Sequence, residues 1–248
     1  MKRIVIIGAT SSIAHECAKL WLKESPKHLT LVVRDADKAQ RVLGDLQVRS
    51  PQSKIEIVQT GFIDPLEIEK TVSDIAKQGA IDIALIAHGS LPEQMDCQAN
   101  LLLCKETLEV NGISPVLFAE CLATVMGKAN QGTIAIIGSV AGDRGRKSNY
   151  VYGAAKGLVS RYAQGLQHRF SMGSPIKIIL IKPGPTDTPM TASFRLKGMK
   201  MASAEDVAKK IVDGIAKGKA VVYAPGKWQL IMLVIQHIPS FIFNKLSI

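Results

Sequence analysis

Residues 4–14, IVIIGATSSIA, form an apolar run that enters a turn rich in Gly and Ser, after which we expect a helix to begin near Ser12. In a strand, turn and helix of this kind, backbone N–H groups and the positive end of the helix dipole hold a pyrophosphate. The segment therefore predicts a dinucleotide-binding unit at the start of the chain. An ordinary strand-to-helix turn that binds nothing is the alternative interpretation.

Apolar runs with the length of buried strands alternate with helical patterns along the chain. They lie at 3–7, 29–33, 55–59, 81–87, 132–138, 176–181 and 219–223. This alternation predicts an α/β fold, a Rossmann-like doubly wound parallel sheet of about seven strands with helices on both faces. The chain has 248 residues, of which 47% are hydrophobic, and no linker or repeat. We therefore expect a single domain over 1–248, in which 226–248 form an apolar, basic tail.

Ser139, Tyr152 and Lys156 carry the chemistry that the sequence predicts. Tyr152 and Lys156 are four residues apart in a stretch with helical periodicity, so their side chains project from one face. Because a neighbouring ammonium favours phenolate, we expect Lys156 to lower the pKa of Tyr152 toward the range of a useful general acid. Ser139 ends the apolar run TIAIIGS, at the carboxyl end of a strand, where open α/β sheets place their ligands.

The motifs and their order resemble the short-chain dehydrogenase/reductase family over essentially the whole chain. The family's glycine pattern, Gly-x-x-x-Gly-x-Gly, is only partly kept, because Ser12 and Ala14 stand at the second and third glycine positions after Gly8. The resemblance implies an NAD(P)-dependent oxidoreductase acting on a carbonyl or alcohol. It also implies cofactor contacts in the turn by Gly8, Thr10, Ser11, Ser12 and Ile13.

The same resemblance assigns catalytic roles. Tyr152 donates a proton to the substrate oxygen, Ser139 holds that oxygen, and Lys156 stabilises the phenolate and binds the cofactor ribose together with Tyr152. Asn111, in TLEVNGISPVLFAECL, matches the mid-helix Asn with which family members hold a water behind the catalytic lysine. An exposed surface Asn is the alternative for Asn111, although its apolar neighbours disfavour it.

The residue after the second strand bears on the choice of cofactor. Arg34 follows LTLVV, where family members that use NAD commonly carry an acidic residue and a basic residue accommodates the 2′-phosphate of NADP. Arg34 therefore favours NADP(H), with a solvated arginine as the alternative. Asp35 beside it keeps NAD(H) open.

Two segments depart from the family on the adenine side. IDIALIAHGS, at 81–90, matches the family's Asn-Asn-Ala-Gly segment only at Gly89, and we expect its His88 to be structural. Gly61 stands where the family carries an adenine-contacting Asp, and Asp64 follows three residues later. We assign Asp64 and Gly89 to the cofactor site, with contacts that differ from the family pattern.

IKIILIKPGPTDTPM, at 176–190, is a strand that leads into Pro-Gly-x-x-x-Thr. The resemblance implies that this motif holds the nicotinamide end of the cofactor, with a simple turn as the alternative. The residues concerned are Pro183, Gly184, Thr186 and Thr188. We expect the residues that follow, to about Ala202, to form a substrate lid.

Composition excludes several other classes of protein. The four cysteines are far apart, with no Cys-x-x-Cys and no companion histidines, so we expect neither a metal site nor disulfides. The net charge is +10, but no basic motif interleaved with aromatic residues indicates nucleic acid. The first strand leaves no room for a signal peptide, so we expect a cytoplasmic protein. Family members are often dimers or tetramers, which implies a homo-oligomer.

The C-terminal tail is both apolar and basic. No acidic side chain follows Asp213, while Lys217, Lys219, Lys227 and Lys245 remain. The apolar run 230–235 is far short of the ~20 residues that span a bilayer. A short apolar segment with flanking lysines and Trp228 can lie at the surface of a membrane with anionic lipids. Packing of the tail in the core or in a dimer is the alternative.

AGDRGRKSNYVYGAAK at 141–156 and the ending KGKAVVYAPGKWQ…HIP…IFNKLSI resemble a narrower group, the reductase components of the decaprenylphosphoryl-ribose 2′-epimerase system. This resemblance implies a polyprenyl-phosphate-linked 2-keto pentose as substrate, made by a partner flavoprotein oxidase, and peripheral contact with the inner face of the membrane. Arg144 and Arg146, with Lys147, are then candidates to bind the substrate phosphate, or are solvated loop charges.

Three other functions stay open. A generic short-chain reductase of a small or acyl ketone has the same catalytic residues and no need of the tail. A noncatalytic NADP-binding regulator is compatible with the altered glycines. A lipid-surface binding module makes the tail the active part.

Overall fold

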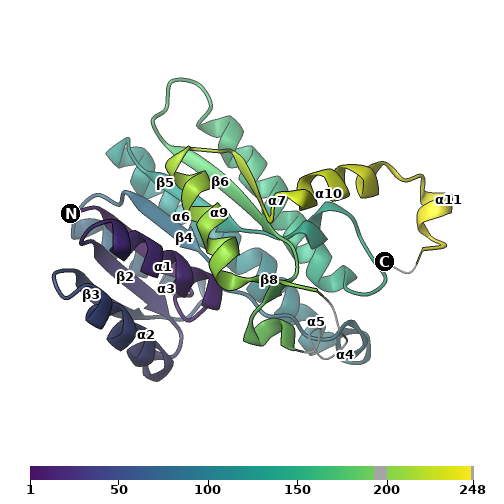
Figure 1. Cartoon of the computed structure of the whole chain (residues 1–248), viewed down its shortest axis with the longest axis horizontal. Coiled ribbons are helices and arrows are strands. Elements are labelled where there is room, and N and C mark those ends of the chain that lie inside the picture. The colour runs from purple at the N-terminus through teal and green to yellow at the C-terminus, as the bar shows by residue number, and fades with distance from the viewer. Residues whose placement is uncertain (193–199, 247–248) are drawn as a thin grey trace.

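The computed structural model describes residues 1–192 and 200–246. Its main sheet is parallel throughout and has the strand order β3-β2-β1-β4-β5-β6-β9 (Figure 1). The strands are β1 Arg3–Ile7, β2 His28–Val33, β3 Lys54–Gln59, β4 Ile83–Ile86, β5 Thr133–Ile137, β6 Lys177–Pro183 and β9 Val221–Ala224. The predicted fold class is confirmed, and each predicted strand is present within a few residues of its expected bounds.

The helices follow the strands in alternation. They are α1 Ser12–Glu24, α2 Ala36–Arg49, α3 Pro65–Lys77, α4 Gln94–Ala99, α5 Leu101–Leu108, α6 Ser114–Ala129, α7 Tyr150–Arg169, α9 Ala204–Ala216, α10 Lys227–His237 and α11 Ser240–Phe243. A π-helical turn, η1 Glu109–Ile113, joins α5 to α6, and two 3₁₀ turns are η2 Val140–Asp143 and η3 Pro189–Thr191. A small parallel pair consists of β7 Thr186–Asp187 and β8 Ala202–Ser203.

The two faces of the sheet bury different helices, because side chains alternate along each strand. Ile4 and Ile6 of β1 pack in the core under α1, α2 and α9. Val5 and Ile7 pack in the second core under α3, α6 and α7. Strands covered on both faces must be apolar throughout, which is why β1 reads as an uninterrupted apolar run.

The order in which strands are added to the sheet reverses at β1, although all strands run parallel. The chain builds β2 and β3 on one side of β1 and then β4, β5 and β6 on the other. The connections on either side of this reversal cover opposite faces of the sheet, which opens a crevice at the carboxyl ends of β1 and β4. This crevice is where the turn after β1 and the residues after β4 and β5 meet.

One continuous helical run, Leu101–Ala129, is long and apolar enough to cross a membrane by length and composition. Its most apolar window is 56% buried inside the protein, and the run contains the polar Asn111, which is fully buried. We therefore interpret it as a core helix.

Gly8 allows β1 and β4 to approach each other at the crevice. Its φ is +82°, and a Cβ on it would lie 2.7 Å from the Cβ and backbone N of His88. Gly8→Ala is therefore expected to lower the free energy of unfolding by about 2 kcal/mol or more, because it adds both backbone strain and overpacking. Urea denaturation measures this change.

Gly44 in α2 is the matched control. A Cβ there meets nothing within 4 Å. Gly44→Ala is expected to raise stability by about 0.5–1 kcal/mol, because alanine loses less conformational freedom in a helix. Equal effects of the two substitutions would contradict this account of the crevice.

Candidate active site

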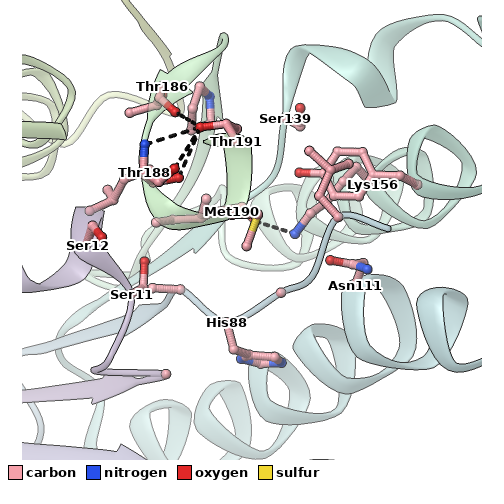
Figure 2. A pocket seen from close by; sticks show the side chains of 18 of the residues that line it. Ser11, Ser12, His88, Asn111, Ser139, Lys156, Thr186, Thr188, Met190 and Thr191 are labelled. Atoms are coloured by element: carbon pink, nitrogen blue, oxygen red, sulfur yellow. Dashed lines mark hydrogen bonds between the residues drawn. The ribbon is translucent and has the colours of Figure 1, made fainter. Parts of the chain in front are cut away.

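A cavity of about 400 Å³ lies at the carboxyl edge of the sheet and gathers most of the predicted site. Figure 2 shows Ser11 and Ser12 on one side of it and Ser139, Lys156 and Asn111 on the other, with the three threonines of the 186–191 loop above. The predicted residues that line it are Gly8, Thr10, Ser11, Ser12, Ile13, Arg34, Gly89, Asn111, Ser139, Arg146, Tyr152, Lys156, Pro183, Gly184, Thr186 and Thr188. Of the predicted site residues, Asp64 and Arg144 do not line it.

The turn after β1 fits a dinucleotide phosphate. Ser11 is the N-cap of α1, yet its side chain makes no capping hydrogen bond, and the first turn of α1 carries no acidic residue. The amide groups that begin this helix are therefore free of a side-chain cap and lie under the positive end of the dipole. Ser12, at the second glycine position of the family pattern, lines the cavity beside them.

Arg34 and Lys38 give one end of the cavity a positive charge. Asp35 also lines the cavity, but its carboxylate accepts a hydrogen bond from the Lys38 amide at 3.1 Å as the N-cap of α2 and lies 3.2 Å from the Lys38 Nζ. These hydrogen bonds hold the pKa of the exposed Asp35 below its usual value. Asp35 is thus held as the N-cap of α2 and is paired with Lys38, so Arg34 is the cation beyond this pair. The sequence did not suggest Lys38 as a cavity residue.

The adenine side differs from the prediction. Asp64 caps α3 by accepting from the Leu66 amide at 2.8 Å and lies outside the cavity lining, so this geometry gives no support to its assignment as a cofactor residue. An aspartate three residues C-terminal of the expected position is drawn into the helix start instead. Phe62, which the sequence did not suggest, lines the cavity, with its ring centroid 5.8 Å from the Arg34 Cζ.

His88 is held as a neutral, buried ring. Its Nε2 lies 2.8 Å from the Ser114 Oγ, and its ring packs edge-on against Phe62 and Phe118. Burial, with Lys156 and Arg34 nearby, lowers its pKa to about 3. The ring therefore stays uncharged at neutral pH, in keeping with the structural role expected for it.

Ser139 and Tyr152 meet at the end of β5. The Ser139 Oγ accepts from the Ala141 amide at 3.1 Å, which leaves its hydroxyl proton available. The same hydroxyl hydrogen-bonds the Tyr152 phenol, and this bond favours the phenolate. Tyr152 lies in the first turn of α7 and Ser139 follows β5, so two different elements bring the two hydroxyls together.

The expected effect of Lys156 on Tyr152 is not what the structure shows. Burial raises the pKa of Tyr152 to about 12, and only the Ser139 hydrogen bond opposes it. The Lys156 Nζ donates to the Ile137 carbonyl at 3.1 Å and lies 5.8 Å from the centre of the Tyr152 ring. Burial also lowers the pKa of Lys156 to about 8. Desolvation is therefore the main cause of both pKa shifts.

Asn111 belongs to the π-helical turn η1 and lies near Lys156. Its Oδ1 accepts from the Ser90 amide at 2.9 Å and its Nδ2 donates to the Thr107 carbonyl at 2.9 Å, so the side chain is fixed. A Cβ on Gly89 would lie 2.7 Å from the Asn111 Oδ1 and 3.8 Å from the Lys156 Nζ. Gly89 therefore acts by lacking a side chain where these two groups converge.

The Pro-Gly-x-x-x-Thr loop is ordered by a residue that the sequence did not suggest. The Thr191 Oγ1 donates to the Thr186 carbonyl at 2.5 Å and accepts from the Thr188 amide at 3.2 Å. Both Thr186 and Thr188 line the cavity, and Figure 2 shows their hydrogen bonds to Thr191. Part of the predicted substrate lid, 193–199, lies outside the described residues.

The two arginines predicted to bind a substrate phosphate have different surroundings. Arg146 lines the cavity, and its buried Nε has no hydrogen-bond partner within residues 1–192 and 200–246. The Arg144 guanidinium instead donates to the carbonyls of Ile235 and Ile238, each at 2.6 Å, at the end of α10. Arg144 therefore anchors the tail, and its contact with substrate stays a prediction.

A buried ion pair connects two segments whose neighbouring residues line the cavity. The Lys182 Nζ lies 2.5 Å from the Asp143 Oδ1, and the two side chains are 8% and 2% exposed. The Tyr223 hydroxyl donates to the other Asp143 oxygen at 3.1 Å. The pair ties the turn after Ser139 to the strand that leads into Pro183 and Gly184. Such a pair fixes geometry more than it adds stability.

No group of three or more His, Cys, Asp or Glu side chains in residues 1–192 and 200–246 can hold a metal ion. A doubly wound sheet, a helix start without a side-chain cap and a Ser–Tyr–Lys cluster in one cavity are typical of the class of NAD(P)-dependent oxidoreductases. The chain belongs to the short-chain dehydrogenase family, whose model, described as short chain dehydrogenase, matches residues 2–198.

Relatives and solved structures agree with this family. The chain is 22% identical to an uncharacterized oxidoreductase of Streptomyces coelicolor, over 100% of this chain and 96% of that protein. It is 25% identical to an uncharacterized oxidoreductase of Mycobacterium tuberculosis, over 98% of this chain and 96% of that protein. A short-chain dehydrogenase from Sphingobium yanoikuyae in complex with NADPH has a TM-score of 0.82 at 20% identity, over 97% of both chains. Levodione reductase has a TM-score of 0.81 at 18% identity, over 92% and 98%.

Proposed function

We propose that the protein reduces a ketone with NADPH and that Tyr152 is the proton donor. The single observation that carries the proposal is the meeting of the Tyr152 and Ser139 hydroxyls in one cavity with the desolvated amine of Lys156. A partly buried phenol with a raised pKa holds its proton until a stronger base forms next to it. The alkoxide that develops from a ketone is such a base.

Each side chain has a defined part in the reduction. Bound NADPH supplies the hydride. The free Ser139 proton hydrogen-bonds the carbonyl oxygen and Tyr152 transfers its proton to it, while the ammonium of Lys156 stabilises the phenolate that remains. Asn111 and a water are the proposed route by which the proton is restored. The amides at the start of α1 and the loop 183–188 would hold the two ends of the cofactor.

NADPH is preferred over NADH in this proposal. Arg34 and Lys38 both line the cavity, and the nearby carboxylate of Asp35 is engaged in capping α2. A 2′-phosphate is favoured by two cations, and a free carboxylate there would repel it. The Sphingobium yanoikuyae structure in complex with NADPH has the same fold.

For the substrate, we propose a ketone on a phosphate-bearing molecule, specifically a polyprenyl-phosphate-linked 2-keto pentose supplied by a flavoprotein oxidase. The sequence resemblance in 141–156 and in the tail supports this choice. Arg146 adds a cation at the cavity with an unpartnered buried Nε, suited to a phosphate oxygen. The Met232 Sδ of α10 lies 3.3 Å from the Arg146 Nη2, so the apolar tail contacts the residue that is proposed to bind that phosphate.

NADPH oxidation with the lipid-linked keto pentose and with soluble ketones tests both the proposed reaction and the proposed substrate. Tyr152→Phe is expected to lower kcat about 10²–10⁴-fold, because the proton donor is lost. Tyr150→Phe is the matched control, since Tyr150 is 46% exposed and does not line the cavity. Activity of Tyr152→Phe equal to that of Tyr150→Phe would rule out Tyr152 as the proton donor. Absence of NADPH oxidation by the wild type with every ketone would favour a noncatalytic regulator. Turnover of soluble ketones alone would leave a generic reductase.

The rate of reduction is expected to fall as the pH rises through about 8. The pKa of Lys156 is lowered to about 8 by burial, so its amine is charged below this pH and neutral above it. Only the charged form stabilises the phenolate, and kcat/KM reports this ionisation in the free enzyme. In Lys156→Arg the inflection should vanish, because guanidinium stays protonated. A wild-type profile that is flat to the onset of tyrosine ionisation would contradict the assignment.

Replacing both Arg34 and Lys38 with alanine is expected to raise the KM for NADPH about tenfold or more and to leave that for NADH nearly unchanged, because only NADPH has the 2′-phosphate. Steady-state kinetics with both cofactors measure this. Lys77→Ala is a suitable control, because Lys77 is exposed and pairs with Asp74 outside the cavity. Equal losses for the two cofactors would show that Arg34 and Lys38 do not read the phosphate.

A further inference from the structure

The outward face of the C-terminal helices is apolar, whereas the outward face of a solvated helix is normally polar. Leu230, Leu233 and Val234 of α10 follow the i, i+3, i+4 spacing of one helix face, and they are 68%, 55% and 58% exposed. Phe241 and Ile242 of α11 continue the apolar surface, with Phe241 70% exposed. We call these five residues the tail face. Scattered apolar residues on a surface need no explanation, but a contiguous set indicates an interaction site.

The opposite face of α10 is already used to hold the helix on the protein. Met232 is fully buried, and Trp228 fills the space beside Gly184, where an added Cβ would clash with its indole ring. Arg144 donates to the carbonyls at the end of α10 and stacks 3.8 Å from the ring centre of Phe243 in α11. Figure 1 shows α10 and α11 projecting from one end of the molecule. The helices that carry the tail face are therefore already fixed to the protein through their other side, and the tail face itself points away from the core.

The charge around the tail face favours anionic lipid over a second copy of the chain. No acidic side chain follows Asp213. Lys227 is the first residue of α10, and Lys245 lies shortly after the end of α11. A symmetric dimer through this face would bring the same lysines of both copies toward one another without acidic partners from this segment. Anionic head groups instead attract the lysines, and the apolar side chains enter the boundary between head groups and acyl chains.

We propose that the tail face binds the surface of a membrane that contains anionic lipids. Trp228 and Met232 connect α10 to Gly184 and Arg146 at the cavity, so binding holds the cavity next to the lipid surface. That placement suits a lipid-linked ketone and in this respect rests on the proposed function. The binding itself requires no catalysis. Trp228, expected from the sequence to lie in the membrane interface, packs against the protein instead.

Co-sedimentation of the full chain with vesicles tests the proposal. We expect the protein to sediment with vesicles of phosphatidylcholine and phosphatidylglycerol, and less with phosphatidylcholine alone. Leu230→Ser combined with Leu233→Ser should lower the partition coefficient at least about tenfold, because two leucines no longer enter the apolar boundary. Leu101→Ser combined with Leu102→Ser in α5 is the matched control, since these leucines are 81% and 78% exposed and should leave vesicle binding unchanged.

Two further measurements keep the outcomes distinct. Thermal unfolding and NADPH binding check that each variant is folded, and Tyr152→Phe should bind vesicles as the wild type does, so loss of the proposed reaction does not affect this test. Wild-type protein that stays in the supernatant with phosphatidylglycerol vesicles at low salt overturns the proposal. So does a change from dimer to monomer on sedimentation velocity in the Leu230/Leu233 variant without a change in vesicle binding, which would assign the face to a second copy.

Discussion

The site depends on the burial of one amine, that of Lys156, whose pKa is shifted by desolvation and by no carboxylate of the described residues. The Lys156 Nζ is held by the Ile137 carbonyl and lies at the point where Asn111 and Gly89 converge. Burial lowers its pKa to about 8 and raises that of Tyr152 to about 12, so neither group is in its ordinary state. Shifted pKa values of this kind are typical of functional sites.

The rest of the carboxyl edge is built to hold that arrangement rigid. The Asp143–Lys182 pair joins the turn after Ser139 to the strand before Pro183, and Tyr223 of the last strand donates to the same aspartate. Arg144, the next residue, fastens α10 to this turn. The turn after Ser139, the loop that begins at Pro183 and the tail are therefore one connected unit, although they come from three separate parts of the chain. In this unit the tail is a structural neighbour of the site and not an appendage.

The departures from the family pattern have local physical explanations. Ser12 and Ala14 replace glycines, but the turn still leaves the start of α1 without a side-chain cap, because Ser11 makes no capping bond. Asp64 caps α3 and does not reach the cavity, where Phe62 and His88 form an apolar wall. Asp35 likewise serves its own helix. Asp35 and Asp64 each accept a hydrogen bond from an amide at the start of the helix they precede, which makes their carboxylates less available for ligand binding.

The parallel sheet and the positions of Ser139, Tyr152 and Lys156 could be predicted before folding was considered, because apolar periodicity and the spacing along one helix are local properties. Gly8 and Arg34 were indicated in the same way by the strands that precede them. The pKa of Tyr152, the anchoring by Arg144, and the presence of Lys38, Phe62 and Thr191 at the site became apparent only in the folded chain. Desolvation and long-range contacts depend on which segments fold over one another, and no local pattern encodes that information.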